Sequence, residues 1–233
     1  MNLARKSNLA LLASAIALLC APALHAQVLT FDVDLNTAAL AAQDSANSPF
    51  YLDFQLNYFG SSSLSDSVTL SRFQYTGGSA LSTPTLNGLA SGNLSNGASL
   101  TATSASQLNE IFQQFSATTT DIQFRASVFE SGSDTTPPEF SAAILDSSTN
   151  PASQVFTDAP DTLSLVTLNV TPTNTLSNVN GYAMTSSADG NTPISGVAAA
   201  ISVPEPSTYA AIFGGAVALF AFCTRRFRKL QVA

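Results

Sequence analysis

The stretch YLDFQLNY, residues 51–58, decides the fold class of this chain of 233 residues. Apolar and polar side chains alternate along it with a period of two, which is the period of a β-strand. One face of such a strand packs on a core and the other faces water, as in an antiparallel sheet. The inward side chains are then Leu52, Phe54, Leu56 and Tyr58, and the outward ones are Asp53, Gln55 and Asn57.

The same alternation recurs along the middle of the chain, at residues 29–35, 121–128 and 140–145. Residues 68–75 change phase halfway, so we expect a β-bulge near Ser71 and Arg72 that keeps their apolar side chains on the core side. We expect shorter strands at 85–89, 97–103, 163–170 and 194–201.

About eight to ten short strands with turn residues between them predict an all-β fold, an antiparallel β-sandwich of jelly-roll type. Strands do not alternate with helices along the chain, which disfavours a parallel sheet. Residues 27–202 are long enough for one domain with a hydrophobic core of its own.

One segment has the period of a helix instead. Ser104 and Gln107 match a helix-capping pair, in which the side chain of each residue hydrogen-bonds to the backbone N–H of the other. The apolar side chains that follow fall at helical spacing, and they are Leu108, Ile111, Phe112 and Phe115. The sequence therefore predicts one short helix, with its apolar stripe docked on the sandwich.

Residues 1–26 have the composition of a secretory signal peptide. Arg5 and Lys6 precede an apolar stretch, and small residues follow it. Cleavage is expected after Ala23 or after Ala26, because signal peptidase selects small side chains near the cut.

Residues 203–233 form a tail of three parts. The first part, residues 203–208, reads VPEPST, and its two prolines favour an extended, unpaired backbone. The second is an uncharged apolar run at 209–223, which as a helix spans roughly 22 Å and, with its flanking residues, marginally crosses a bilayer core of about 30 Å. The third part is a membrane-stop cluster that we expect to remain in the cytoplasm, formed by Arg225, Arg226, Arg228 and Lys229.

This tail resembles the sorting signal of the bacterial PEP-CTERM proteins, in its motif, its short helix and its terminal arginines. The resemblance implies that an exosortase, an integral-membrane cysteine protease, recognises Pro204, Glu205 and Pro206 and removes the tail during export. The alternative is a plain C-terminal membrane anchor with a proline-rich junction. The order of segments in the domain also resembles an exported β-sandwich family that usually carries such a tail and has no assigned reaction.

The charges of the exported domain exclude several functions. Arg72 and Arg125 are its only cations, against 14 acidic residues before Glu205, so its net charge is near −12. Nucleic acid is a poor partner for such a surface. The domain also has no Cys or Trp, and the one His lies at position 25, which excludes catalytic triads and zinc sites built on His or Cys.

Three strand carboxylates remain as candidates for chemistry. Asp32, Asp34 and Asp53 could serve a glycoside hydrolase, but outward Asp residues on a solvated acidic face are the simpler interpretation. Structural calcium is the one cofactor that the residues leave open, with Asp32 and Asp34 as neighbouring ligands on one face. Tyr51 is the one aromatic on an outward position, where it could stack on a sugar ring.

The sequence therefore predicts an exported, non-enzymatic protein, held in the inner membrane by its tail and then released to the cell surface or the extracellular space. Its expected partners are an exosortase-type protease, the membrane and an extracellular polysaccharide. Its expected role is structural or adhesive in a surface, biofilm or exopolysaccharide matrix. The alternatives are a glycan- or calcium-binding module and, less favoured, a carboxylate-dependent glycoside hydrolase.

Overall fold

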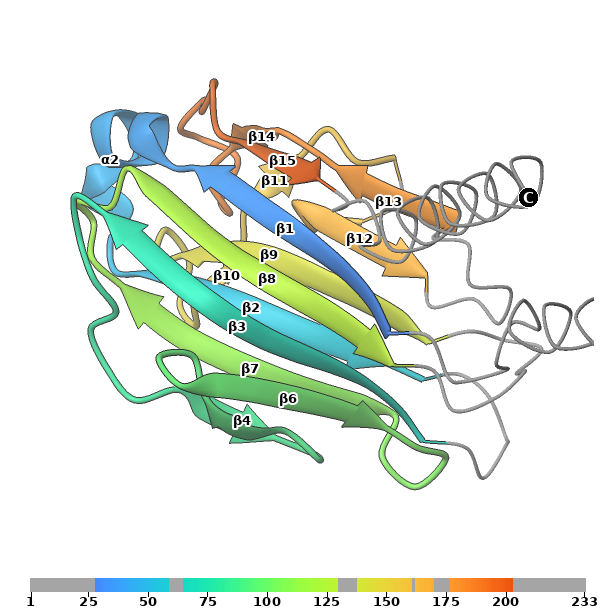
Figure 1. The fold of residues 1–233 in the computed structure, drawn as a ribbon. Coiled ribbons are helices and arrows are strands. Elements are labelled where there is room, and N and C mark those ends of the chain that lie inside the picture. Colours follow the sequence, from blue (N-terminus) through green and yellow to red (C-terminus); the bar gives the residue numbers. More distant parts are fainter. Residues whose placement is uncertain (1–27, 59–64, 130–137, 161, 170–176, 203–233) are drawn as a thin grey trace, which may run out of the picture.

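The computed structural model describes residues 28–58, 65–129, 138–160, 162–169 and 177–202 (Figure 1). The predicted signal peptide and the predicted transmembrane tail lie outside these residues. Within them, no helix has both the length and the apolar character that crossing a membrane requires.

Antiparallel strands form two large sheets. Sheet A has the strand order β15-β1-β8-β3-β6-β5. Its strands are β1 (Val28–Asn36), β3 (Asp66–Thr76), β5 (Ser91–Asn93), β6 (Gly97–Ala102), β8 (Asp121–Phe129) and β15 (Ala198–Ser202).

Sheet B has the strand order β13-β12-β9-β2-β7-β4, and β10 pairs with the free part of β9. Its strands are β2 (Phe50–Asn57), β4 (Thr85–Asn87), β7 (Leu108–Phe115), β9 (Glu139–Asp146), β10 (Ser153–Gln154), β12 (Val166–Asn169) and β13 (Ser177–Gly181). A third, two-stranded sheet joins β11 (Phe156–Thr157) to β14 (Met184–Ser186).

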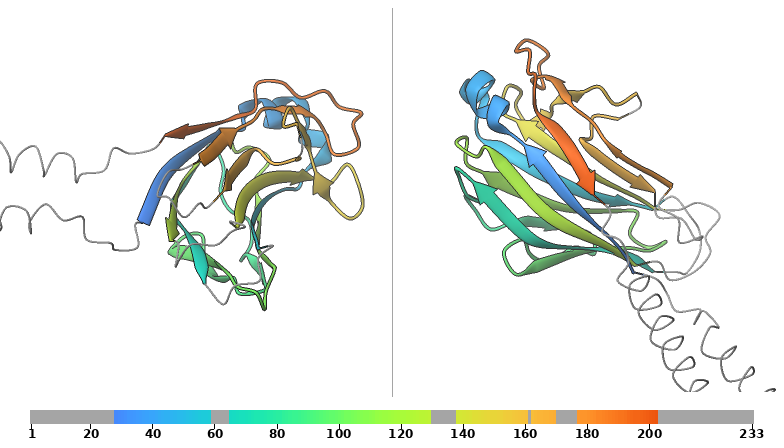
Figure 2. Two further views of the ribbon diagram at one scale, coloured as in Figure 1. Left: turned by 90° about the vertical axis from the view of Figure 1, so that its right-hand side faces the viewer. Right: turned by 45° about the horizontal axis from the view of Figure 1, so that its top comes forward.

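The two large sheets face each other across one hydrophobic core (Figure 2). Phe54 of β2 lies at its centre, with its ring edge-on to Phe124 of β8 at 5.1 Å between centroids and stacked on Phe140 of β9 at 6.4 Å. All the apolar side chains that the alternation of residues 51–58 and 121–128 predicts as inward are buried. The period-two pattern therefore predicted the core-facing side of these strands correctly.

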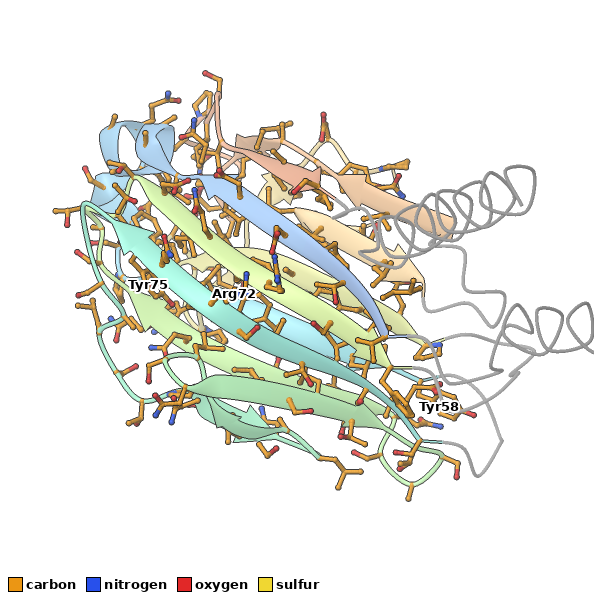
Figure 3. The ribbon with its side chains drawn as sticks, in the orientation of Figure 1. Tyr58, Arg72 and Tyr75 are labelled. Carbon is orange, nitrogen blue, oxygen red and sulfur yellow. The ribbon has the colours of Figure 1, made fainter. Side chains whose placement is uncertain are left out.

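The bulge predicted in residues 68–75 is present in β3. Its pairing with β8 shifts register between Ser71 and Gln74, and Arg72 takes the left-handed backbone conformation, with φ of 56°. The shift lets Phe73 and Tyr75 pack against the core after the phase change. It leaves Arg72 exposed on the outer side of sheet A (Figure 3).

The helix predicted after Ser104 is wrong, because residues 108–115 form strand β7, which lies between β2 and the edge strand β4 of sheet B. Leu108, at the start of the supposed apolar stripe, is 50% exposed, whereas the polar Asn109 and Gln113 point inward and are buried. Both find hydrogen-bond partners there: Gln113 Nε2 donates to the Ser82 carbonyl at 2.7 Å, and the Leu89 N–H donates to Asn109 Oδ1 at 2.7 Å. Tertiary pairing on both edges of β7 thus overrides the helical spacing.

A short helix occurs elsewhere, as α2 (Ala38–Gln43), followed by the 3-10 turn η1 (Ser45–Asn47). Leu40 is its one buried residue, and no side chain caps its first turn. Gln43 fastens it through two reciprocal hydrogen bonds to the backbone of Ser195, at 3.0 and 3.2 Å. The helix therefore depends on contacts with a distant segment, since six residues are too few to be helical alone.

The two ends of the described domain lie toward the same pole. Strand β15 pairs antiparallel with β1, so it runs toward the end of the sheet at which β1 begins. Helix α2 follows the other end of β1 and marks the opposite pole (Figure 1). The pole with α2 therefore lies opposite Val28 and Ser202, the first and last described residues.

Candidate functional site

A hollow of about 440 Å³ opens on the outer face of sheet A. Side chains from β1, β3 and β8 line it, and the end of β15 forms one wall. The polar lining consists of Asp32, Asp34, Arg72, Gln74, Gln123, Arg125 and Ser202. The structure thus brings together two of the carboxylates singled out from the sequence and both arginines of the described residues.

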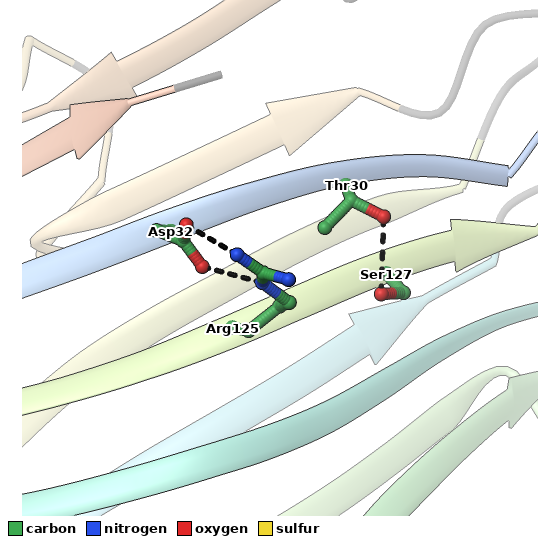
Figure 4. A network of polar contacts seen from close by, with 4 residues as sticks. All are labelled: Thr30, Asp32, Arg125 and Ser127. Carbon is green, nitrogen blue, oxygen red and sulfur yellow. Dashed lines mark hydrogen bonds and ion pairs between the residues drawn. The ribbon is translucent and has the colours of Figure 1, made fainter. Parts of the chain in front are cut away.

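Asp32 is engaged by Arg125, its direct neighbour across β1 and β8 (Figure 4). Arg125 donates from Nε to Asp32 Oδ1 at 2.6 Å and from Nη2 to Oδ2 at 2.7 Å. These hydrogen bonds hold the pKa of Asp32 below its ordinary value. Sequence analysis missed this partner, because Arg125 lies on a strand 93 residues further along the chain.

Asp34 has a different hydrogen-bond partner from Asp32. Its Oδ2 accepts a hydrogen bond from Gln123 Nε2 at 3.1 Å. Burial raises the pKa of the neighbouring Asp121 to about 6, and a hydrogen bond with Asp34 adds to the rise. In the part of the chain that the structure describes, no three His, Cys, Asp or Glu side chains form a group that could hold a metal ion. Calcium at Asp32 and Asp34 stays a prediction, and the ion would have to compete with Arg125 for both oxygens of Asp32.

Arg72 is the second cation of the hollow. Its left-handed backbone is a conformation that non-glycine residues seldom adopt, and such strain often accompanies a functional position. Its charge also contributes to the lowered pKa of Asp32. Together the two arginines balance Asp32 and Asp34, so the hollow is a locally neutral, strongly hydrogen-bonding surface on an acidic domain.

A second polar cluster lies on the outer face of sheet B, around Asp53 and Glu110. Asp53 was expected on a solvated face, but it is only 3% exposed. Gln55 Nε2 donates to Asp53 Oδ2 at 2.7 Å, and Gln154 donates to the same oxygen at 3.4 Å. Glu110 is held by Asn87, whose Nδ2 donates to Oε2 at 2.5 Å. Amide side chains therefore surround two neighbouring carboxyl groups, and no cation among the described residues pairs with either of them.

The surroundings of Asp53 favour the protonated form of its carboxyl group. Burial raises the pKa of Asp53 to about 7, and the charge of Glu110 and a hydrogen bond with it add to the rise. The other oxygen of Asp53, Oδ1, has no hydrogen-bond donor among the described residues. A proton on Asp53 would relieve both the burial of charge and the repulsion.

Tyr51 lies beside this cluster and stacks on Phe112, with 4.6 Å between ring centroids and 16° between ring planes. Phe112 belongs to β7 and pairs with Asp53 of β2. An aromatic surface next to carboxyl and amide groups is the composition of many sugar-binding sites. The sequence singled out Tyr51, but it could not place Phe112 there because residues 108–115 were assigned to a helix.

The candidate carboxylates differ from the pair of a glycoside hydrolase. Such enzymes place two carboxyl groups about 5 Å or more apart, across the bond that is cleaved. Asp53 lies within hydrogen-bonding reach of Glu110. Asp32 is held in an ion pair by Arg125.

The predicted sorting residues, Pro204, Glu205 and Pro206, and the membrane-stop cluster lie outside the described residues. No protein-family model, curated protein or solved structure matches this chain.

Proposed function

We propose that this chain is an exported protein of the cell surface or of an extracellular polysaccharide matrix, with a structural or adhesive and non-enzymatic role. We further infer that its domain is a jelly-roll β-sandwich, since successive strands β1, β2 and β3 alternate between the two sheets. The motifs of residues 1–26 and 203–233 support the export route, and the acidic, strand-rich domain between them supports a role outside the cell.

The observation that carries this proposal is the pairing of β15 with β1. Ser202, the last described residue, lies opposite Asp32, and β15 runs toward the start of β1. Ser202 therefore lies toward the pole away from α2, and we infer that a tail attached there would tether the domain by that pole. A domain tethered in this way presents its α2 pole and both outer sheet faces to the surroundings.

The sorting step assigns a role to each part of the tail. Pro204, Glu205 and Pro206 are the residues that an exosortase-type protease would recognise in an extended backbone. The membrane-stop cluster would hold the chain in the inner membrane until cleavage. The proposed sorting does not depend on the calcium ion that the sequence predicts at Asp32 and Asp34.

Replacement of Pro204, Glu205 and Pro206 by Ala tests the sorting step in the native host. The full-length form is expected to accumulate in the membrane fraction, whereas the matched change of Ser207 and Thr208 to Ala leaves processing intact. Unchanged release of processed protein from the first variant would contradict recognition at these three residues. Equal retention of both variants would favour a plain membrane anchor.

A second candidate function is glycan binding at the outer face of sheet B, favoured by the stack of Tyr51 on Phe112. An array of surface polysaccharides, probed with the full-length protein, tests it. Binding that falls at least tenfold in the Tyr51→Ala variant supports this function, and binding that does not change excludes Tyr51 from the site. Release of shortened glycans would instead indicate a hydrolase.

A further inference from the structure

The bulge of β3 adds one outward side chain to the face of sheet A. The pairing with β8 shifts between Ser71 and Gln74, so two residues of β3, Arg72 and Phe73, lie opposite a single residue of β8. Phe73 packs against the core, whereas Arg72 is exposed on the outer face. The register shift therefore places the Arg72 side chain in the lining of the hollow.

Arg72 occupies a backbone position that suits glycine. Its φ of 56° lies in the left-handed region, where a side chain is strained and where bulges of one common type have glycine. A glycine would form the same bulge without this strain, so the bulge alone does not account for an arginine. Strained residues of this kind concentrate at functional positions such as ligand clamps.

The Arg72 guanidinium is free to bind a ligand. It forms no hydrogen bond or ion pair with any of the described residues. Arg125 uses two of its five N–H groups on Asp32, which leaves the others to a ligand. The Gln74 side chain also has no hydrogen-bond partner among the described residues. The hollow therefore offers unused hydrogen-bond donors from two arginines and one amide.

The two arginines are the only cationic side chains of the described residues, and both line this one hollow. Its volume of about 440 Å³ falls within the roughly 300–1,000 Å³ of small-molecule sites. Phe124 is the one aromatic residue of the lining, and its ring is buried in the core. The hollow thus suits a ligand that is recognised by charge and hydrogen bonds rather than by ring stacking.

We propose that the hollow binds a uronic acid residue of an acidic polysaccharide, with Arg72 as the anchor of the sugar carboxylate. A guanidinium and a carboxylate form two parallel hydrogen bonds, which is the pairing that Arg125 already makes with Asp32. This inference rests on the proposed function, because it names the class of extracellular polysaccharide that the domain meets. The site lies on the opposite sheet from the stack of Tyr51.

The acidic side chains of the hollow favour a sugar over a simple anion. Asp34 lies two residues from Asp32 on the same face of β1, and its carboxylate accepts hydrogen bonds. A sugar hydroxyl can donate to Asp34 and accept from the Gln74 amide, whereas an anion without hydroxyl groups would only be repelled by Asp34. A uronic acid carries the carboxylate and the hydroxyl groups on one ring, so it matches both kinds of group.

Isothermal titration calorimetry of the purified full-length chain tests this site. The probes are trimers of galacturonate, glucuronate and mannuronate, and the matched ligand controls are the neutral trimers of galactose, glucose and mannose. At least one uronate trimer is expected to bind at least tenfold more tightly than its neutral counterpart. Arg72→Gly should weaken that binding at least tenfold while keeping the bulge, because glycine tolerates the left-handed backbone. Its melting temperature checks that the variant is folded.

Two further variants separate the hollow from the rest of the surface. Gln74→Ala should weaken uronate binding, whereas Gln107→Ala should not, because Gln107 is exposed between β6 and β7 and does not line the hollow. Arg72→Lys keeps the charge but cannot form the two-bond pairing, so it should bind less tightly than the unchanged chain.

Three results would overturn the proposal. They are no heat with any uronate trimer at about 10 mM, equal binding of the uronate and neutral trimers, and unchanged uronate binding in Arg72→Gly. None of them bears on export, since the replacement of Pro204, Glu205 and Pro206 tests the sorting step separately.

Discussion

Arg125 of β8 holds Asp32 of β1 through two parallel hydrogen bonds, Nε to Oδ1 at 2.6 Å and Nη2 to Oδ2 at 2.7 Å. Among the described residues this is the one ion pair that the structure shows. It joins two strands that already exchange backbone hydrogen bonds, and it fixes the guanidinium at the wall of the hollow.

A double-mutant cycle measures this pair. Because both side chains are open to water, we expect only a small favourable coupling between Asp32→Asn and Arg125→Gln in urea unfolding at low salt. The coupling should shrink as salt is added. An unfavourable coupling at low salt, or one that grows as salt is added, would contradict this ion pair.

The pH dependence of stability reports on Asp53. Its pKa is raised in the folded state, so the folded chain binds a proton more tightly than the unfolded chain does. The stabilisation is present at low pH and is lost as the pH rises from about 4 to about 7, by an amount on the order of 3 kcal/mol. Urea unfolding at a series of pH values checks this. Asp53→Asn should flatten the slope, and an equally steep slope in that variant would assign it to other carboxyl groups.

Leu108 and Ile111 distinguish strand from helix in residues 108–115. In β7, Leu108 is exposed and Ile111 is fully buried, whereas a helical stripe would bury both. Leu108→Thr should therefore change stability by less than about 0.5 kcal/mol, and Ile111→Ala should cost about 2–4 kcal/mol. Equal losses in the two variants, measured by thermal unfolding, would contradict the strand.

The left-handed backbone of Arg72 determines how substitutions at this position should change stability. Glycine adopts φ of 56° without strain, whereas alanine does not. Arg72→Gly should therefore be about 1 kcal/mol more stable than Arg72→Ala, although glycine usually destabilises a strand. The reverse order in chemical denaturation would place residue 72 in an ordinary strand conformation.

The comparison of sequence with structure shows where pattern analysis succeeds. Alternation identified the core face of β1, β2 and β8, because each of these strands lies between two neighbours and over one continuous core. The phase change in residues 68–75 located the bulge at Arg72, because a bulge is the local way to correct such a change.

The sequence pattern predicted the wrong structure or burial where contacts with other strands determine them. Residues 108–115 read as a helix because Asn109 and Gln113 look solvent-facing until their buried partners are known. Asp53 looked solvated because the amide groups that cover it come from residues 55 and 154. Helix α2 carries no local signal, since Gln43 is anchored by Ser195, 152 residues away.

The most direct test of the proposed sorting is mass spectrometry of the protein recovered from outside the native host. The account predicts that this protein lacks residues 1–23, as well as the apolar run and the membrane-stop cluster of the tail, while the domain that ends near Ser202 is intact. Extracellular protein that still carries Phe220 through Lys229 would contradict it.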